Sequence, residues 1–174
     1  MKNIFAVLFA AVLLLSLQSC PESSVEIIKD AIRLSEAELM DIPAYDWYSS
    51  TKKYYETDPA VISEIESKFD ADSFRFLVFL SPCSICSAKQ FEAPRFIRAL
   101  NDAGIGEEFY EIYTVPAFPD SEHPYMAVLE LKRLPGLYVL KNEIPVYSIL
   151  DTLTEVPSKS TFTIERLISE ALDK

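Results

Sequence analysis

The pattern of apolar and polar positions is clearest at residues 74–80, which read Phe-Arg-Phe-Leu-Val-Phe-Leu. A run that is apolar at almost every position predicts a central strand whose two faces are both covered. The run ends at Ser81-Pro82, and Cys83-Ser84-Ile85-Cys86 comes directly after it. The residues that follow are rich in Ala, Lys, Gln and Phe and are compatible with a helix. The sequence therefore predicts a buried strand that leads two cysteines into the first turn of a helix.

The helix after the cysteines is expected to run through Phe91 and Leu100 and to end near Gly104, with a kink at Pro94. The apolar pattern beyond it predicts a strand at 109–115, a helix at 124–132 with Met126 and Leu129 inward, an antiparallel hairpin of strands at 137–140 and 144–150, and a last helix begun by Thr161 or Thr163. Right-handed crossovers would make the first two strands parallel. This order predicts an α/β fold with one mixed sheet of four to five strands and helices on both faces.

Upstream of the central strand, residues 25–40 carry apolar side chains at a roughly helical spacing and predict an amphipathic helix. Residues 44–57 form an aromatic cluster without clear periodicity, and its members are Tyr45, Trp47, Tyr48, Tyr54 and Tyr55. Such a cluster is either a peptide-binding face or, more often, an extension that packs against the domain. Asp58-Pro59 predicts the start of the next helix, because aspartate caps a helix and proline suits its first position.

The N-terminus has the pattern of an export signal. Its unbroken apolar run at 4–15 is shorter than the ~20 residues that span a bilayer. Leu17-Gln18-Ser19-Cys20 resembles the bacterial lipobox, in which Cys20 would be acylated and become the first residue of the mature protein. The alternatives are an uncleaved anchor and an ordinary cleaved signal. We therefore expect a signal peptide at 1–19, a lipid-anchored tether and extension at 20–57, and a domain at 58–174 that faces the periplasm or exterior from a bacterial membrane.

Composition narrows the classes of function. The 174 residues carry a formal net charge of −11, which argues against nucleic acid and against electrostatic binding to anionic lipid. The chain has 3 cysteines, so acylation of Cys20 leaves Cys83 and Cys86 with no partner but each other. Export places this pair in a compartment where a disulfide persists. The sequence has no phosphate loop and no nucleotide fingerprint, and no cofactor is expected.

A Cys-x-x-Cys pair at the first turn of a helix suits redox chemistry. The free N–H groups and the positive end of the helix dipole stabilise a thiolate, which is the reactive form of cysteine. The spacing of three lets one sulfur attack a substrate while the other closes on it and releases the product. The pair is therefore a candidate active site.

Three features together resemble the thioredoxin superfamily over roughly residues 58–174. They are the cysteine pair after the first strand of this order, the proline in the following helix, and the segment 133–142, which reads Arg-Leu-Pro-Gly-Leu-Tyr-Val-Leu-Lys-Asn. The resemblance implies a thioredoxin-like fold. It also implies that Cys83 is the exposed nucleophile and that Cys86 is the buried resolving thiol.

The resemblance further implies that Pro135 is cis and lies beside the sulfurs, with the backbone of Leu134 pairing with an extended substrate. The sequence departs from the family in two places. Ser84-Ile85 between the cysteines supplies no charge to the thiolate, and Leu77 stands where thioredoxins place a buried acid. Proton transfer to or from Cys86 would then need another group or water.

Three functions follow as alternatives. The one favoured by the cysteines' place at a helix start is a membrane-tethered thiol–disulfide oxidoreductase, which acts on exported protein thiols or disulfides with a membrane or periplasmic redox partner. The second is a non-catalytic binding lipoprotein in which Cys83 and Cys86 form an inert disulfide. The third is a copper or zinc chaperone with His123, the sole histidine, as a further ligand, although two thiolates fall short of the four ligands of a closed zinc site.

Overall fold

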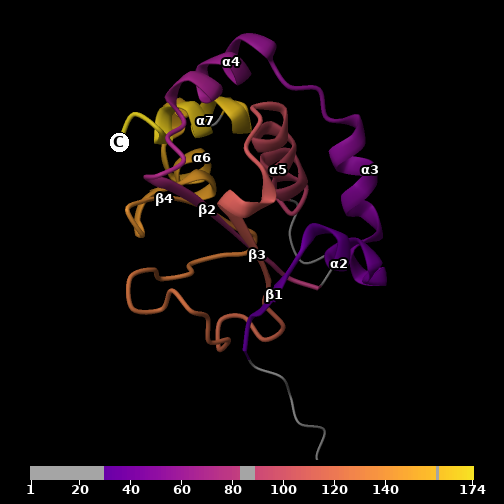
Figure 1. Cartoon of the computed structure of the whole chain (residues 1–174). Helices are drawn as coiled ribbons and strands as arrows, with labels where there is room; N and C mark the ends of the chain where they lie inside the picture. The colour runs from indigo at the N-terminus through magenta and orange to yellow at the C-terminus, as the bar shows by residue number, and fades with distance from the viewer. Residues whose placement is uncertain (1–29, 83–88, 160) are drawn as a thin grey trace, which may run out of the picture.

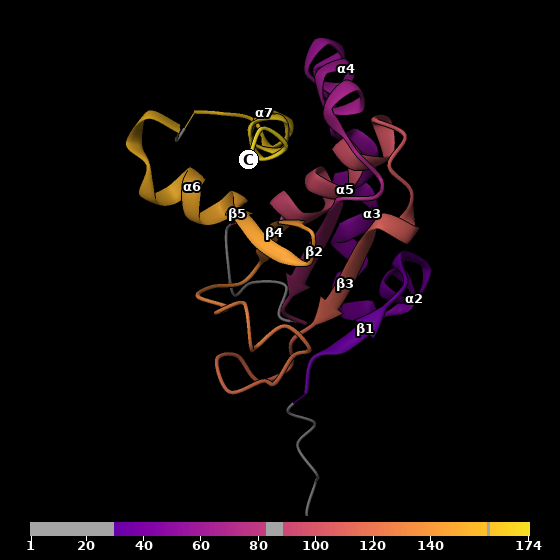
Figure 2. The same cartoon turned by 60° about the vertical axis from the view of Figure 1, so that its left-hand side comes forward.

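The computed structural model describes residues 30–82, 89–159 and 161–174, and its centre is a five-stranded mixed sheet (Figure 1). The strands are β1 (Ile32–Leu34), β2 (Phe74–Leu80), β3 (Tyr110–Thr114), β4 (Gly136–Lys141) and β5 (Ile144–Ser148). Their order is β1-β3-β2-β4-β5, with β1 and β5 at the two edges (Figure 2). The pair β2/β3 is parallel, whereas β1/β3, β2/β4 and β4/β5 are antiparallel. The expected α/β class and mixed sheet are confirmed.

Strand β2 occupies the centre of the sheet because it can bury side chains on both faces. Phe76, Val78 and Leu80 point into the larger core, while Leu77 and Phe79 point into a second one. All five are at most 1% exposed. The near-continuous apolar run thus meets the condition for a strand covered on both sides, as the sequence indicated.

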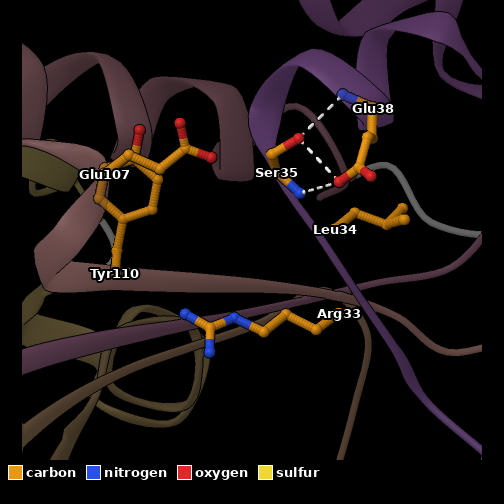
Figure 3. A pocket seen from close by; sticks show the side chains of 6 residues that line it. All are labelled: Arg33, Leu34, Ser35, Glu38, Glu107 and Tyr110. Carbon is orange, nitrogen blue, oxygen red and sulfur yellow. Dashed lines mark hydrogen bonds between the residues drawn. The ribbon is translucent and has the colours of Figure 1, made fainter.

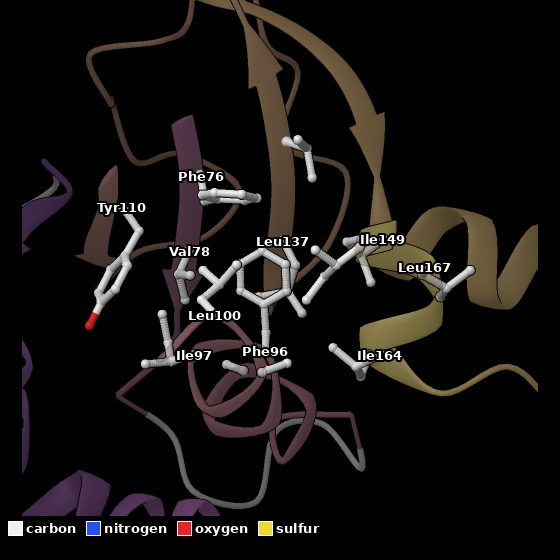
Figure 4. Packing of buried hydrophobic residues seen from close by; sticks show 14 of the residues in the cluster. Phe76, Val78, Phe96, Ile97, Leu100, Tyr110, Leu137, Ile149, Ile164 and Leu167 are labelled. Atoms are coloured by element: carbon white, nitrogen blue, oxygen red, sulfur yellow. The ribbon is translucent and has the colours of Figure 1, made fainter. Parts of the chain in front are cut away.

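The described helices all pack on one face of the sheet. They are α2 (Glu36–Asp41), α3 (Asp46–Tyr54), α4 (Pro59–Lys68), α5 (Glu92–Asp102), α6 (Ile149–Glu155) and α7 (Ile164–Ala171), with 3₁₀ turns η1 (Pro43–Tyr45), η2 (Glu107–Phe109) and η3 (Pro157–Lys159). Each of the α-helices contributes buried residues to the larger core. In Figure 4, Phe96 and Leu100 of α5 meet Phe76 and Val78 of β2, and the rings of Phe76 and Phe96 are 5.9 Å apart.

The second face is covered by the segment 116–135, which contains no helix. Its Leu129 is buried and its Tyr125, Leu131 and Leu134 pack partly buried against the second core. The prediction of a helix at 124–132, and with it the prediction of helices on both faces, is wrong for the described chain. Met126 is 57% exposed, so the segment has no continuous apolar stripe that a helix would bury.

The N-terminal extension packs into the larger core from Leu34 onward. The helix expected at 25–40 is confirmed at 36–40 and is wrong for residues 30–35, because Ile32–Leu34 pairs with β3 as an edge strand. Helix α2 begins only after Ser35, which forms a reciprocal capping box with Glu38. The aromatic cluster packs against the domain as favoured, since Tyr45 and Tyr48 are at most 1% exposed, whereas Tyr54 is 76% exposed.

Other element boundaries are partly as expected. Asp58 caps α4 and Thr163 precedes α7, and β4 and β5 form the expected hairpin. Pro94 lies in the first turn of α5, where its missing N–H breaks no helical bond, so the expected kink within a longer helix is wrong for the described part of α5. Strand β5 ends at Ser148, and α6 follows where the sequence suggested more strand. Among the described residues, no helix is both long and apolar enough to cross a bilayer.

Candidate functional site

The candidate site lies at the end of the sheet to which β2 runs. Leu80 is the last residue of β2, and Pro82 is exposed two positions further on. Cys83 follows Pro82 directly in the sequence. Cys83 and Cys86 themselves, like the predicted lipidation site Cys20, lie outside the described residues.

Strand β4 brings the second predicted element to the same end. Phe79 pairs with Gly136 in the antiparallel register of β2 and β4. Strand β4 begins at Gly136, so Pro135 directly precedes it at the end of the sheet where β2 ends. The Leu134–Pro135 peptide bond is cis, as the resemblance implied. The structure therefore brings Leu134 and Pro135 to the sheet end where the chain continues to Cys83.

The start of β4 is held in place by contacts on both sides. Arg133 lies 2.7 Å from a carboxylate oxygen of Asp151 and 2.6 Å from one of Glu155, both on α6. Gly136 packs so closely that a Cβ atom there would lie 2.6 Å from Leu131 and 2.9 Å from the ring of Tyr138. These contacts fix the start of β4 against α6 on one side and Leu131 on the other.

Strand β3 and the extension complete this end of the sheet. The N–H of Val115 donates to the carbonyl oxygen of Leu80 at 2.7 Å. Next to it, the hydroxyl groups of Tyr45 and Thr114 share a buried hydrogen bond of 2.6 Å. Burial raises the pKa of Tyr45 to about 12, while the bond to Thr114 opposes that rise. Tyr45 is therefore neutral near pH 7 and acts as a structural tie.

An aromatic pair lies where the chain returns from the cysteine segment. Trp47 packs edge-on against Phe91, with the ring centroids 5.5 Å apart. The indole N–H of Trp47 donates to the carbonyl oxygen of Ala44 at 3.1 Å, which fixes the ring. No local pattern in the sequence indicates this contact, because the two residues are far apart along the chain. Trp47 does not adjoin the cysteines in sequence, yet it borders the residues that follow them.

The helix that was expected to begin at the cysteines is described only from Glu92, after a turn at 89–91. The N–H groups of α5 are therefore not shown to face Cys83, and stabilisation of a thiolate by a helix start stays a prediction.

His123 also lies close to this end of the sheet. Its ring is 5.0 Å from that of Phe79, centroid to centroid, and its Nδ1 is shielded from solvent without a hydrogen-bond partner among the described residues. Desolvation lowers the pKa of His123, so its neutral form predominates at pH 7. Within the described ranges, no three histidine, cysteine, aspartate or glutamate side chains converge on a common metal position.

A separate surface cavity of about 300 Å³ lies near the other end of the sheet (Figure 3). It is lined by Arg33, Leu34, Ser35, Glu38, Glu107 and Tyr110. The Ser35 hydroxyl and N–H bond to Glu38 at one side of it, and the N–H of Glu36 donates to Glu107 at 2.8 Å. Since Tyr110 pairs with Phe76, this cavity lies toward the start of β2, away from the candidate site.

Comparison with known proteins gives no relative: no family model, no curated protein and no solved structure matches the chain.

Proposed function

We propose that the protein is a membrane-tethered, extracytoplasmic thiol–disulfide oxidoreductase with a thioredoxin-like fold, and that Cys83 and Cys86 are its redox pair. The observation that supports the proposal is the antiparallel register of β2 and β4, which brings the start of β4, directly after Pro135, to the end of β2 that leads toward Cys83. The residues before Cys83 and the residues around Pro135 both carry the resemblance to thioredoxins. They are more than fifty positions apart along the chain, yet they lie at the same end of the sheet.

The topology supports the finer fold assignment. A central strand leads into the cysteines, its parallel neighbour is β3, and the hairpin β4–β5 lies antiparallel on its other side, followed by a C-terminal helix. This is the arrangement that the resemblance implies. Two features differ from the expected pattern: the segment 116–135 replaces a helix, and the edge strand β1 lies where part of a helix was expected.

The chemistry proposed for the reducing direction needs only the two cysteines and a substrate disulfide. The Cys83 thiolate attacks one substrate sulfur, the substrate S–S bond breaks, and a mixed disulfide forms while one substrate thiol leaves. Cys86, as thiolate, then attacks the Cys83 sulfur and releases the second substrate thiol. The substrate gains two electrons and two protons, and the pair becomes a disulfide that an external dithiol reduces again.

In this proposal the described residues bind the substrate, and the two cysteines carry out the chemistry. Leu134 offers its backbone at the edge next to the cysteine segment, where an extended substrate would pair as an added strand.

The test is reduction of insulin disulfides by the purified chain with dithiothreitol as the electron source. We expect the wild type to accelerate the reaction, Cys83→Ser to abolish the acceleration, and Cys86→Ser to accumulate reducible mixed disulfides through Cys83. Cys20→Ser is the matched control, because it removes a cysteine that the mechanism does not use.

The two alternatives predict different results in the same experiment. An inert disulfide would give no acceleration and a reduction potential below about −300 mV. A metal chaperone would retain copper or zinc after gel filtration, and His123→Gln would weaken that retention.

A further inference from the structure

We draw no further inference here: the strongest candidate, the surface cavity between β1, the start of α2 and η2 that is lined by Arg33, Glu38, Glu107 and Tyr110, rests on two carboxylates beside a six-residue helix, and nothing in the described part of the chain shows what would occupy it.

Discussion

The contact between the single histidine and Phe79 makes the stability of the fold depend on pH. His123 packs on Phe79, and its lowered pKa is caused by desolvation. In the unfolded chain the imidazole returns to a pKa of about 6.5. At a pH between the lowered pKa of the folded protein and the pKa of the unfolded chain, the unfolded state binds more protons than the folded state. The free energy of unfolding therefore decreases as the pH falls below about 7.

We predict that urea unfolding between pH 7.5 and pH 5 shows this loss of stability and that His123→Gln removes most of it. Histidine is the only side chain whose ordinary titration lies in this window, and the chain has 1 histidine, so the assignment is direct. A variant that loses stability over this range as steeply as the wild type would contradict the desolvated environment of His123.

Residue contacts at the candidate site divide into those that the sequence could indicate and those that it could not. Pro135 was singled out because it stands in a segment with a recognisable pattern, and its cis bond is confirmed. The Trp47–Phe91 and Tyr45–Thr114 contacts join residues that are far apart along the chain and that only the tertiary fold brings together. No local pattern of spacing carries such information.

At the scale of elements, the sequence was most informative where burial is continuous. Strand β2 and the β4–β5 hairpin were predicted because their residues are apolar at nearly every position or flank a short polar turn. Strand β1 was not, because its half-exposed residues share their spacing with a helix face. The Ser35–Glu38 capping box marks the true start of the helix. The segment 116–135 buries isolated side chains without any period, so no periodic pattern could describe it.

The contact between β4 and that segment can be tested through Gly136. A methyl group at this position would lie 2.6 Å from Leu131 and 2.9 Å from Tyr138, whose side chains pack in the second core. Such overpacking typically costs about 1–3 kcal/mol, so we predict that Gly136→Ala lowers the free energy of unfolding by that amount in urea titration.

Gly106→Ala is the control for this substitution. There the added methyl group would meet the carboxylate of Glu108, an exposed side chain that can turn away. Its backbone φ of −78° also suits alanine, and we expect stability that is equal or slightly higher because alanine restricts the unfolded chain. Equal effects of the two substitutions would show that β4 and the segment 116–135 are not tightly packed.

At the scale of the whole molecule, the extension and the domain form one folding unit. Residues expected to lie in a separate extension at 20–57 supply the edge strand β1 and the fully buried side chains of Leu39, Tyr45 and Tyr48. Burying a large apolar side chain contributes roughly 1.5–3 kcal/mol, so these three alone contribute roughly 5–9 kcal/mol. That is comparable to the total stability of a typical domain, about 5–15 kcal/mol.

We therefore predict that the chain 58–174 does not fold, although it contains β2, the cysteines and Pro135. It should lack a cooperative thermal transition and the near-ultraviolet dichroism of packed aromatic rings, and trypsin should degrade it rapidly. The chain 30–174 should retain all three properties because it keeps β1, α2 and α3. A cooperative transition of the chain 58–174 near that of the longer one would mean that the extension only decorates a self-sufficient domain. If instead the prediction holds, the tether and the redox pair are joined through one rigid core, because the residues that lead in from residue 30 also complete the sheet end beside Cys83.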